Sequence, residues 1–330
     1  MTTGPISTTF LNPAELLPSE WQRLAEGPLY TFNPGLIRSS DDRWILAYRV
    51  VGTDGRRRIG ICRLNRDFGV VAGSAKALSD SFSFKNPDVY PPVALDWFAD
   101  PRLIRLQGRL FIYWNSGWHE PRNHQFLQEL DERSLHPVGT PRELVLEGAE
   151  RRKLEKNWML FESGDRVLAV YSVQPHRVLA CELSGTNDIV CRDLACVEWS
   201  PMAYPACHGG IRGGAPPQSA GGLLWSFCHT VHDGPDGYVY RAVAYAFSQR
   251  PPFSPSQAPF ASLPLYHGRL PARRHVRLNP AVGEVIYPCG AIRVNDQWVI
   301  SWGLNDETCA VSTLSEDTVH STVSPRNGPL

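Results

Sequence analysis

Residues 99–114 read ADPRLIRLQGRLFIYW, and this stretch contains the pattern that decides the fold. A short polar motif with a proline, Asp100-Pro101-Arg102, leads into an apolar strand. An aromatic-rich strand ending at Trp114 follows about ten residues later, and a third apolar stretch begins at Phe126. Short runs of β-branched and aromatic residues between turn signals are typical of antiparallel β-structure.

The same pattern recurs in five copies along the chain. The copies begin near residues 33, 100, 157, 215 and 289, which gives a repeat of about 60 residues. A unit of three or four strands cannot bury both of its faces alone, so the copies must pack on one another. We therefore predict an all-β, five-bladed β-propeller that forms a single domain over residues 1–330. The alternative, a β-sandwich, does not explain a repeat of this length.

The composition excludes several classes of protein. The chain has 330 residues with 33 Lys+Arg and 33 Asp+Glu, so it lacks the basic field that nucleic-acid binding requires. No apolar run approaches the ~20 residues of a membrane span, and the N-terminus lacks the pattern of a secretory signal. The eight cysteines form no Cys-x-x-Cys pair, which favours buried free thiols over zinc ligands or disulfides. We expect a cytoplasmic protein without a metal.

Three segments lie outside the repeated pattern. Residues 12–26 predict a short N-terminal helix, because polar residues precede an amphipathic run. Residues 251–271 are rich in proline and serine and predict an ordered surface loop. The residues from about 315 onward predict a frayed tail in which one strand can close the ring.

The motif starts supply the candidate functional residues. In a propeller the innermost strands surround a central cavity, so the residues that open them become neighbours despite their distance in sequence. These starts contribute one acid, several cations and polar groups, namely Asn33, Asp100, Arg102, Lys156, Asn157, Gly214 and Cys289. Such a set is suited to an anionic sugar or a phosphate. From the residues alone, however, Asp100 can equally be a turn residue that bonds its own backbone.

Taken in order, these motifs resemble the β-mannoside phosphorylases and hydrolases of glycoside hydrolase family 130. The matching runs are Asn-Pro…Tyr-Arg, Asp-Pro-Arg, Lys-Asn, Gly-Gly-x-Pro-Pro…His and Pro-x-Gly-Ala…Trp-Gly-x-x-Asp, and they span residues 30–313. The resemblance extends to the related β-mannosyltransferases with the same propeller. One departure is Ala99, which stands where this family usually has an acid before the catalytic aspartate.

The resemblance implies a role for each matching residue. Asp100 is expected to be the general acid, with its proton passing through a sugar hydroxyl. The anion is expected to be held by basic residues of neighbouring blades, namely Arg49, Arg102, Lys156 and His229. The sugar is expected to contact Asn33, Asn157 and Asp306. The residues themselves leave other readings open, since Arg49 can pair with a neighbouring carboxylate and His229 can be a core histidine.

The expected activity is the inverting transfer of a β-mannosyl group to or from phosphate. Phosphate brings its own negative charge, so a second carboxylate base is unnecessary, whereas a hydrolase needs one to activate water. Asp96 is the nearest acid in sequence for that purpose. The expected partners are an oligosaccharide or glycoside and inorganic phosphate or a sugar phosphate, with no further cofactor. The alternatives are a nucleotide-sugar-dependent β-mannosyltransferase, a glycoside hydrolase and a non-catalytic sugar-binding propeller, and the oligomeric state is open.

Overall fold

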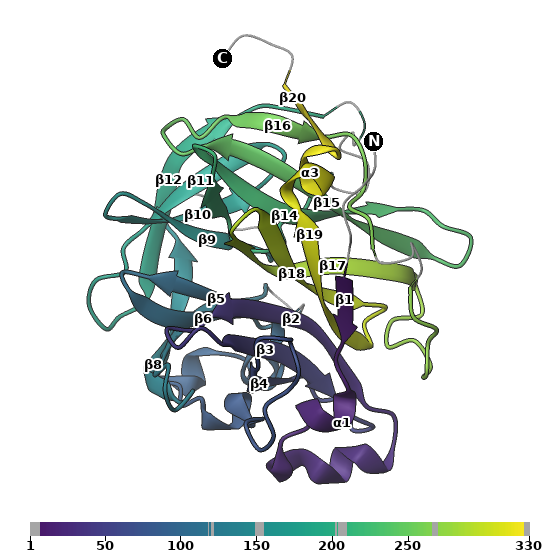
Figure 1. Ribbon diagram of the computed structural model, residues 1–330. Helices are drawn as coiled ribbons and strands as arrows, with labels where there is room; N and C mark the ends of the chain where they lie inside the picture. Colours follow the sequence, from purple (N-terminus) through teal and green to yellow (C-terminus); the bar gives the residue numbers. More distant parts are fainter. Residues whose placement is uncertain are drawn as a thin grey trace.

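β-Strands dominate the computed structural model, as the sequence predicts (Figure 1). It describes residues 7–117, 119, 122–148, 155–201, 203, 210–265 and 270–326. The strands pair mainly with their neighbours in sequence, in antiparallel register. In the described part of the chain they form three sheets, of nine, eight and three strands, whose antiparallel groups are described below in chain order.

The first two groups correspond to the copies that begin near residues 33 and 100. The first group pairs in the order β2 (Tyr30–Arg38), β3 (Trp44–Val51) and β4 (Arg58–Leu64). The second pairs in the order β5 (Ala99–Leu106), β6 (Arg109–Asn115), β7 (Gln125–Leu130) and β8 (Pro137–Leu146).

The next three groups continue the pattern. The third consists of β9 (Met159–Ser163), β10 (Arg166–Ser172), β11 (His176–Cys181) and β12 (Ile189–Val197). The fourth consists of β13 (Gln218–Ala220), β14 (Leu223–His232), β15 (Tyr238–Ser248) and β16 (Pro255–Pro259). The fifth consists of β17 (Val282–Val294), β18 (Gln297–Leu304) and β19 (Thr308–Ser315).

Parallel pairs connect some of these groups. The outer strands β8 and β12 pair side by side over residues 144–146 and 189–191, and β15 pairs with β17 at Tyr238 and Tyr240. The first strands of the groups also meet each other, since β2 contacts both β5 and β17. The groups therefore surround a shared interior to which their first strands contribute.

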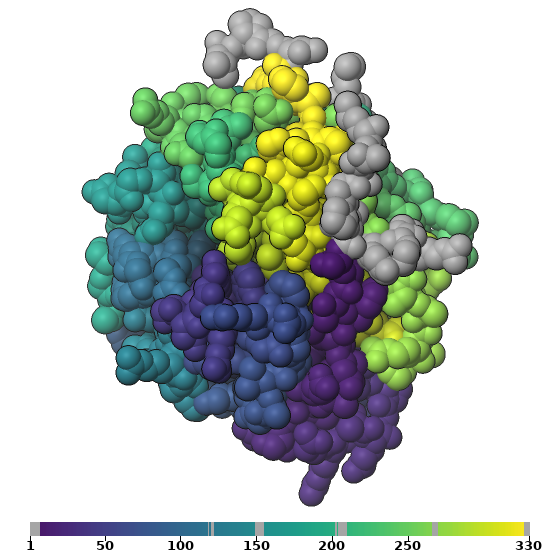
Figure 2. Space-filling model, in the orientation of Figure 1, coloured from purple at the N-terminus to yellow at the C-terminus, as the bar shows by residue number. Residues whose placement is uncertain are grey.

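The strand that completes the fifth group comes from the N-terminal part of the chain. Strand β1 (Ser7–Phe10) pairs antiparallel with β19, so that Ser7 lies opposite Thr313 and Phe10 opposite Ala310. Figure 1 shows β1 beside β19, and Figure 2 shows the purple N-terminal residues against the yellow C-terminal part. This closing strand lies near the start of the chain, whereas the sequence pattern had pointed to the segment after residue 315.

The predicted N-terminal helix is two short pieces. Helix α1 (Pro13–Leu16) begins at Asn12, whose side chain accepts a hydrogen bond from the Ala14 amide, and a 3₁₀ helix follows at Ser19–Glu26. Pro18 separates them, because a proline restricts the residue before it to extended conformations. Further short helices connect strands, namely 3₁₀ helices at Leu78–Ser81 and Pro87–Val89 and helix α2 (Pro92–Asp96).

The segments predicted as loop and tail are more ordered than expected. Strand β16 lies inside the proline-rich segment 251–271, and helix α3 (Glu316–His320) and strand β20 (Val323–Pro325) lie inside the predicted tail. Strand β20 pairs with β16, so the two segments supply each other's backbone hydrogen-bond partners although neither has a strong strand pattern in its sequence. No helix in the described ranges is both long enough and apolar enough to cross a membrane.

The apolar cores lie between neighbouring strand groups. Large side chains such as Trp114, Trp158, Trp298 and Trp302 are fully buried there. Six cysteines are buried free thiols, as predicted, whereas Cys196 is exposed and Cys207 lies outside the described residues. The described residues contain no group of three or more His, Cys, Asp and Glu side chains placed to hold a metal ion.

Candidate active site

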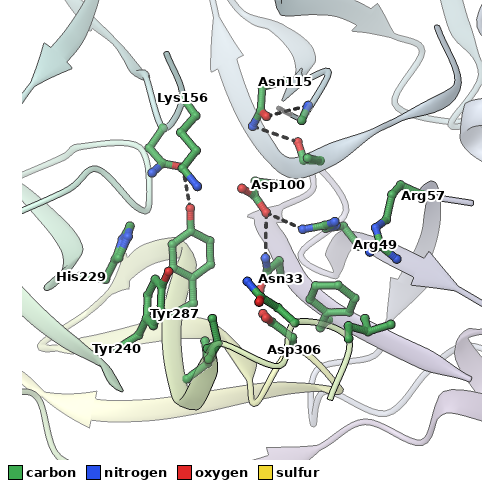
Figure 3. A pocket seen from close by; sticks show the side chains of 18 of the residues that line it. Asn33, Arg49, Arg57, Asp100, Asn115, Lys156, His229, Tyr240, Tyr287 and Asp306 are labelled. Carbon is green, nitrogen blue, oxygen red and sulfur yellow. Dashed lines mark hydrogen bonds and ion pairs between the residues drawn. The ribbon is translucent and has the colours of Figure 1, made fainter. Parts of the chain in front are cut away.

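A cavity of about 300 Å³ lies where the first strands of the groups meet, and it gathers most of the predicted site residues. Of the residues to which the family resemblance gives a role, all except Arg102 line it, namely Asn33, Arg49, Asp100, Lys156, Asn157, His229 and Asp306. Gly214 and Cys289, the other candidates at motif starts, are not among the lining residues. The lining residues come from all parts of the chain between residues 33 and 306. Figure 3 shows Asp100 near the centre of the cavity, surrounded by the labelled side chains of Asn33, Arg49, Lys156, His229 and Asp306.

The backbone at the motif starts is bent in the same way in successive groups. Asn33, Asp100 and Asn157 have φ angles of 51°, 53° and 64°, a left-handed conformation that is uncommon outside glycine. In the first two groups a bulge accompanies it, because the strand register shifts between Phe32 and Gly35 and between Ala99 and Arg102. A bulge re-aims a side chain, and such strained positions gather at functional sites.

Asp100 is held as a carboxylate by two donors. Its Oδ1 accepts hydrogen bonds from Asn33 Nδ2 at 2.7 Å and from Arg49 Nη1 at 3.1 Å. Burial raises the pKa of Asp100, but Arg49, Arg102, Lys156 and the Asn33 hydrogen bond outweigh it and lower that pKa to about 2. Asp100 is therefore ionised at neutral pH in the protein without ligand.

Asp306 is the second carboxylate on the cavity wall, and its environment raises its pKa, whereas that of Asp100 is lowered. Burial raises the pKa of Asp306, and the nearby Asp100 charge raises it further, although Arg49, Arg273 and Lys156 oppose this. The cavity thus contains two carboxylates whose pKa values are pushed apart. Such pairs often divide acid and base roles between them.

The cations lie on two sides of Asp100. Figure 3 shows Lys156 and His229 on one side and Arg49 and Arg57 on the other. Lys156 lines an open cavity and remains accessible to solvent, yet burial among protein groups lowers its pKa, with Asp100 acting against this. A lysine side chain beside an open cavity is placed to bind a phosphate oxygen.

His229 contributes an imidazole without a charge. Burial lowers the pKa of His229 well below its ordinary value, and Arg212, Lys156 and Arg102 lower it further. Its ring lies 4.5 Å from the ring of Tyr287 in an edge contact and stacks on Tyr240 at 5.6 Å. Its buried Nδ1 has no hydrogen-bond partner. His229 can therefore donate one N–H to an anion, but it cannot supply a positive charge at neutral pH.

Arg102 lies behind the cavity wall, which revises its predicted place among the anion ligands. Its guanidinium is fully buried, and it donates from Nε to the Gly214 carbonyl at 2.7 Å and from Nη2 to the Tyr287 hydroxyl at 2.9 Å. That hydroxyl in turn donates to Asn157 Oδ1 at 2.6 Å. Arg102 thus fixes Tyr287 and Asn157 on the wall and acts on Asp100 through its charge.

Several lining residues were not predicted from the sequence. Tyr287 directly precedes the Pro-Cys-Gly-Ala motif of the fifth repeat, so its position beside a motif start could have identified it as a cavity residue. Tyr240 lies within strand β15, and Trp97 precedes strand β5. Arg57 belongs to an arginine-rich turn before β4, where nothing in the sequence distinguishes it from its neighbours.

The sequence analysis considered two further positions, 99 and 96, for a second acid near Asp100, and the structure shows where both lie. Ala99 lines the cavity, so no carboxylate enters it from this position. Asp96 lies outside the set of lining residues, and its exposed side chain accepts a hydrogen bond from Arg56 at 3.3 Å. Asp96 is therefore not placed to activate a water in this cavity.

Comparison with known proteins gives matches in structure. No family model matches the sequence, and no curated protein matches it significantly. A β-1,2-mannobiose phosphorylase from Listeria innocua, solved with β-1,2-mannobiose, has a TM-score of 0.61 at 13% identity, covering 96% of this chain and 99% of that one. A mannose phosphorylase from Leishmania mexicana, solved with a phosphate ion, has a TM-score of 0.53 at 12% identity, covering 92% and 89%.

A third match performs a different transfer. A GDP-Man-dependent mannosyltransferase from Leishmania mexicana has a TM-score of 0.50 at 10% identity, covering 94% of this chain and 89% of that one. At these identities the likeness concerns the fold and not the activity. The chain therefore shares its fold with members of the mannoside phosphorylase and mannosyltransferase superfamily that its motifs resemble.

Proposed function

We propose that the chain is a carbohydrate-active enzyme of glycoside hydrolase family 130, built as a single five-bladed propeller. The five successive antiparallel groups are its blades, and pairing of β1 with β19 closes the ring. The ordered motifs, the shared fold and the convergence of distant motif starts on one cavity all support this assignment. Sugar phosphates and nucleotide sugars are cytoplasmic metabolites, so we place the reaction in the cytoplasm.

The proposed reaction is the inverting transfer of a β-mannosyl group to or from phosphate. The observation that carries it is an ionised Asp100 held between Asn33 and Arg49, in a cavity where Lys156 and His229 face it from the other side. Phosphate would bind at Lys156 and at the His229 N–H, with the sugar between phosphate and Asp100. Asn157 and Asp306 would hydrogen-bond its hydroxyl groups.

The charge of Asp100 assigns it a role in each direction. As an anion it can accept the proton of an acceptor hydroxyl, which is the step needed when mannose 1-phosphate is the donor. In phosphorolysis Asp100 must instead supply a proton through a sugar hydroxyl. A phosphate bound at Lys156 would neutralise part of its charge and add a negative charge near Asp100, and both effects would raise the pKa of Asp100 toward the range in which it carries a proton.

A nucleotide-sugar-dependent mannosyltransferase is the second candidate. The same cations would then hold the diphosphate of the donor, and one structural neighbour uses GDP-mannose. A hydrolase is the third candidate. Its base cannot be Asp96, which is exposed and paired with Arg56, so Asp306, the second carboxylate of the described cavity wall, would have to activate the water.

Product analysis tests these assignments. The protein is mixed with a pool of sugar acceptors and either mannose 1-phosphate or GDP-mannose, and products are identified by mass spectrometry. Hexose addition from mannose 1-phosphate alone supports the phosphorylase, and addition from GDP-mannose alone supports the transferase.

The Asp100→Asn variant is the essential control. Because this change removes the proton-transferring group, we expect turnover to fall by about 10²- to 10⁴-fold while the fold is retained. A variant that binds and reacts as the wild type does would contradict a catalytic role for Asp100 and favour a sugar-binding module.

A further inference from the structure

Three successive arginines, two in the turn before β4 and the third at its first residue, have different environments. Arg56 donates from Nη2 to Asp96 Oδ1 at 3.3 Å, and Arg58 forms an ion pair with Asp54. Arg57, which lies between them, has no carboxylate within ion-pair distance in the described part of the chain. Arg57 is also the one of the three that lines the cavity. The turn therefore presents its unpaired guanidinium to the site and pairs the other two elsewhere.

The guanidinium of Arg57 is partly withdrawn from water, and two of its nitrogens have no hydrogen-bond acceptor. Its Nε and Nη1 are buried and donate no hydrogen bond to any residue that the structure describes. Burial and, to a smaller extent, the neighbouring charge of Arg49 lower the pKa of Arg57 to about 10, although Asp306 opposes this. An arginine at this pKa is still charged at neutral pH. Buried donors left unpaired are costly and rare, which points to a ligand that pairs them.

Trp97 lies beneath this charge, so that the guanidinium covers part of one ring face and the rest of the ring is left as an apolar surface. The Arg57 guanidinium carbon lies 5.2 Å from the Trp97 ring centroid, and the two backbones are joined by a parallel bridge. The ring packs closely against Gly117, where an added Cβ would come within 2.3 Å of the Trp97 Nε1. Trp97 and Gly117 line the same cavity. An aromatic face next to a guanidinium matches a sugar ring that carries an anionic group.

Arg57 lies on the side of the cavity away from the proposed phosphate position. Figure 3 shows Arg57 beyond Arg49 on one side of Asp100, and Lys156 and His229 on the other. In an inverting displacement the nucleophile and the leaving group occupy opposite faces of the anomeric carbon. If phosphate binds at Lys156, the Arg57 side is left to the acceptor sugar. This orientation rests on the proposed function.

We propose that Arg57 and Trp97 form an acceptor subsite for an acidic sugar, whose carboxylate or phosphate ester pairs with the Arg57 guanidinium. The ring of this acceptor packs on Trp97, and its reacting hydroxyl points toward Asp100. Ala99, which lines the same cavity, leaves space without adding a competing carboxylate. The acceptor therefore supplies the negative charge that the protein does not place beside Arg57.

An acceptor series with matched variants tests this subsite. The acceptors are D-mannose, D-glucose, D-glucuronate and D-glucose 6-phosphate, each with mannose 1-phosphate or GDP-mannose as the donor. Arg57→Met removes the charge and keeps much of the apolar stem, Arg57→Lys keeps the charge, and Arg56→Met removes the adjacent exposed charge as a control. Binding of glucuronate and of glucose 6-phosphate is measured separately by calorimetry.

We expect at least one acidic acceptor to exceed the neutral ones in kcat/KM. Arg57→Met should lower kcat/KM for that acceptor by about 10- to 100-fold and leave the neutral acceptors within about 3-fold. Arg57→Lys should retain part of the preference, and Arg56→Met all of it. Preference for glucuronate assigns the anionic group as a carboxylate, and preference for glucose 6-phosphate assigns it as a phosphate ester.

The outcomes separate this inference from the proposed function. If neutral sugars are mannosylated while acidic sugars neither bind nor react, the acidic subsite is overturned and the transfer activity stands. If Arg57→Met weakens GDP-mannose and every acceptor equally, Arg57 serves the donor, and the inference is again overturned. A third outcome is that no acceptor reacts, while an acidic sugar binds to the wild type and to Arg56→Met but does not bind to Arg57→Met. In that case the acidic subsite stands and the proposed transfer reaction is wrong.

Discussion

At the residue scale, the cavity is organised by the contrast between Asp100 and Asp306. Asp100 is bonded to Asn33 and Arg49 and stays ionised, whereas burial raises the pKa of Asp306. The cationic surroundings hold Asp100 in the charged form, and an anionic ligand on Lys156 would weaken that hold. The protonation state of the candidate acid is thus coupled to whether the cavity is occupied.

The low pKa of Asp100 has a consequence for stability. Its folded pKa of about 2 lies below the ordinary value of 3.8, so its ionised form stabilises the folded state. This contribution of about 2 kcal/mol is complete above pH ~4 and is lost as the pH falls toward 2. We expect the difference in unfolding free energy between wild type and Asp100→Asn to shrink by that amount over this range.

Denaturant unfolding at a series of pH values measures this difference. Asp96→Asn is the matched control, because the Asp96 side chain is exposed, and its effect should stay within about 0.5 kcal/mol. A difference between wild type and Asp100→Asn that is constant from pH 5 to pH 2 would contradict the low pKa.

The sequence predicted the residues that open the repeated strands and missed those that depend on packing. Asn33, Asp100 and Asn157 stand at motif starts, so their convergence follows from the repeat itself. The side-chain direction of Arg102 was not predictable, because it depends on the Gly214 carbonyl and the Tyr287 hydroxyl of distant strands. Arg57 was missed because its distinction from Arg56 and Arg58 lies in the partners of each.

At the element scale, the first strands approach each other too closely for side chains at some positions. A Cβ on Gly35 would lie 2.8 Å from the Pro101 carbonyl oxygen, and one on Gly290 would lie 2.4 Å from the Leu36 amide nitrogen. Both neighbours are backbone atoms of an adjacent strand group, so neither can move aside alone. These contacts set the spacing of the strands whose bulges carry Asn33 and Asp100.

Gly290→Ala tests the importance of this spacing. The added methyl group would overlap the backbone of β2, and we expect the unfolding free energy to fall by about 1–3 kcal/mol. Gly108→Ala is the control, because its φ of 74° strains an alanine while no atom lies within 4 Å of the new Cβ. That variant should lose only about 1 kcal/mol. Equal losses in the two variants would show that close approach is not the limiting factor.

Elements were predictable from the sequence where hydrophobic pattern decides them. The aromatic and aliphatic runs that begin at Trp44, Leu110 and Trp298 are all central strands of their groups. By contrast, β1 reads Ser-Thr-Thr-Phe and has no strong alternation, and its strand conformation comes from pairing with β19. Strand β16 was likewise hidden, because prolines disfavour strands in general, and Pro255 and Pro259 stand at its two ends.

At the scale of the whole molecule, the pairing of β1 with β19 joins the two ends of the described chain. Thr9 lies opposite Val311, and the hydroxyl groups of Thr8 and Ser312 are 2.7 Å apart. Without β1, the outer edge of β19 would present unpaired amides and carbonyls. Such an edge is a template for association with other chains.

Removal of residues 1–10 tests this closure. We expect the truncated protein to unfold at lower denaturant concentration and to self-associate, as measured by size-exclusion chromatography with light scattering. A synthetic peptide of residues 1–12 should restore the stability in trans, and a scrambled peptide should not. A truncated protein that stays as stable and as monodisperse as the full chain would contradict a closing role for β1.

The same pairing constrains the order of events during biosynthesis. Thr8 and Ser312 are separated by 304 positions, so β1 leaves the ribosome long before its partner exists. At about 5–20 residues per second the delay is roughly 15–60 s. Contacts of such long range form late and slow the overall folding rate. We therefore expect the nascent chain to complete this pairing only after translation, with the first strand left without its partner until then.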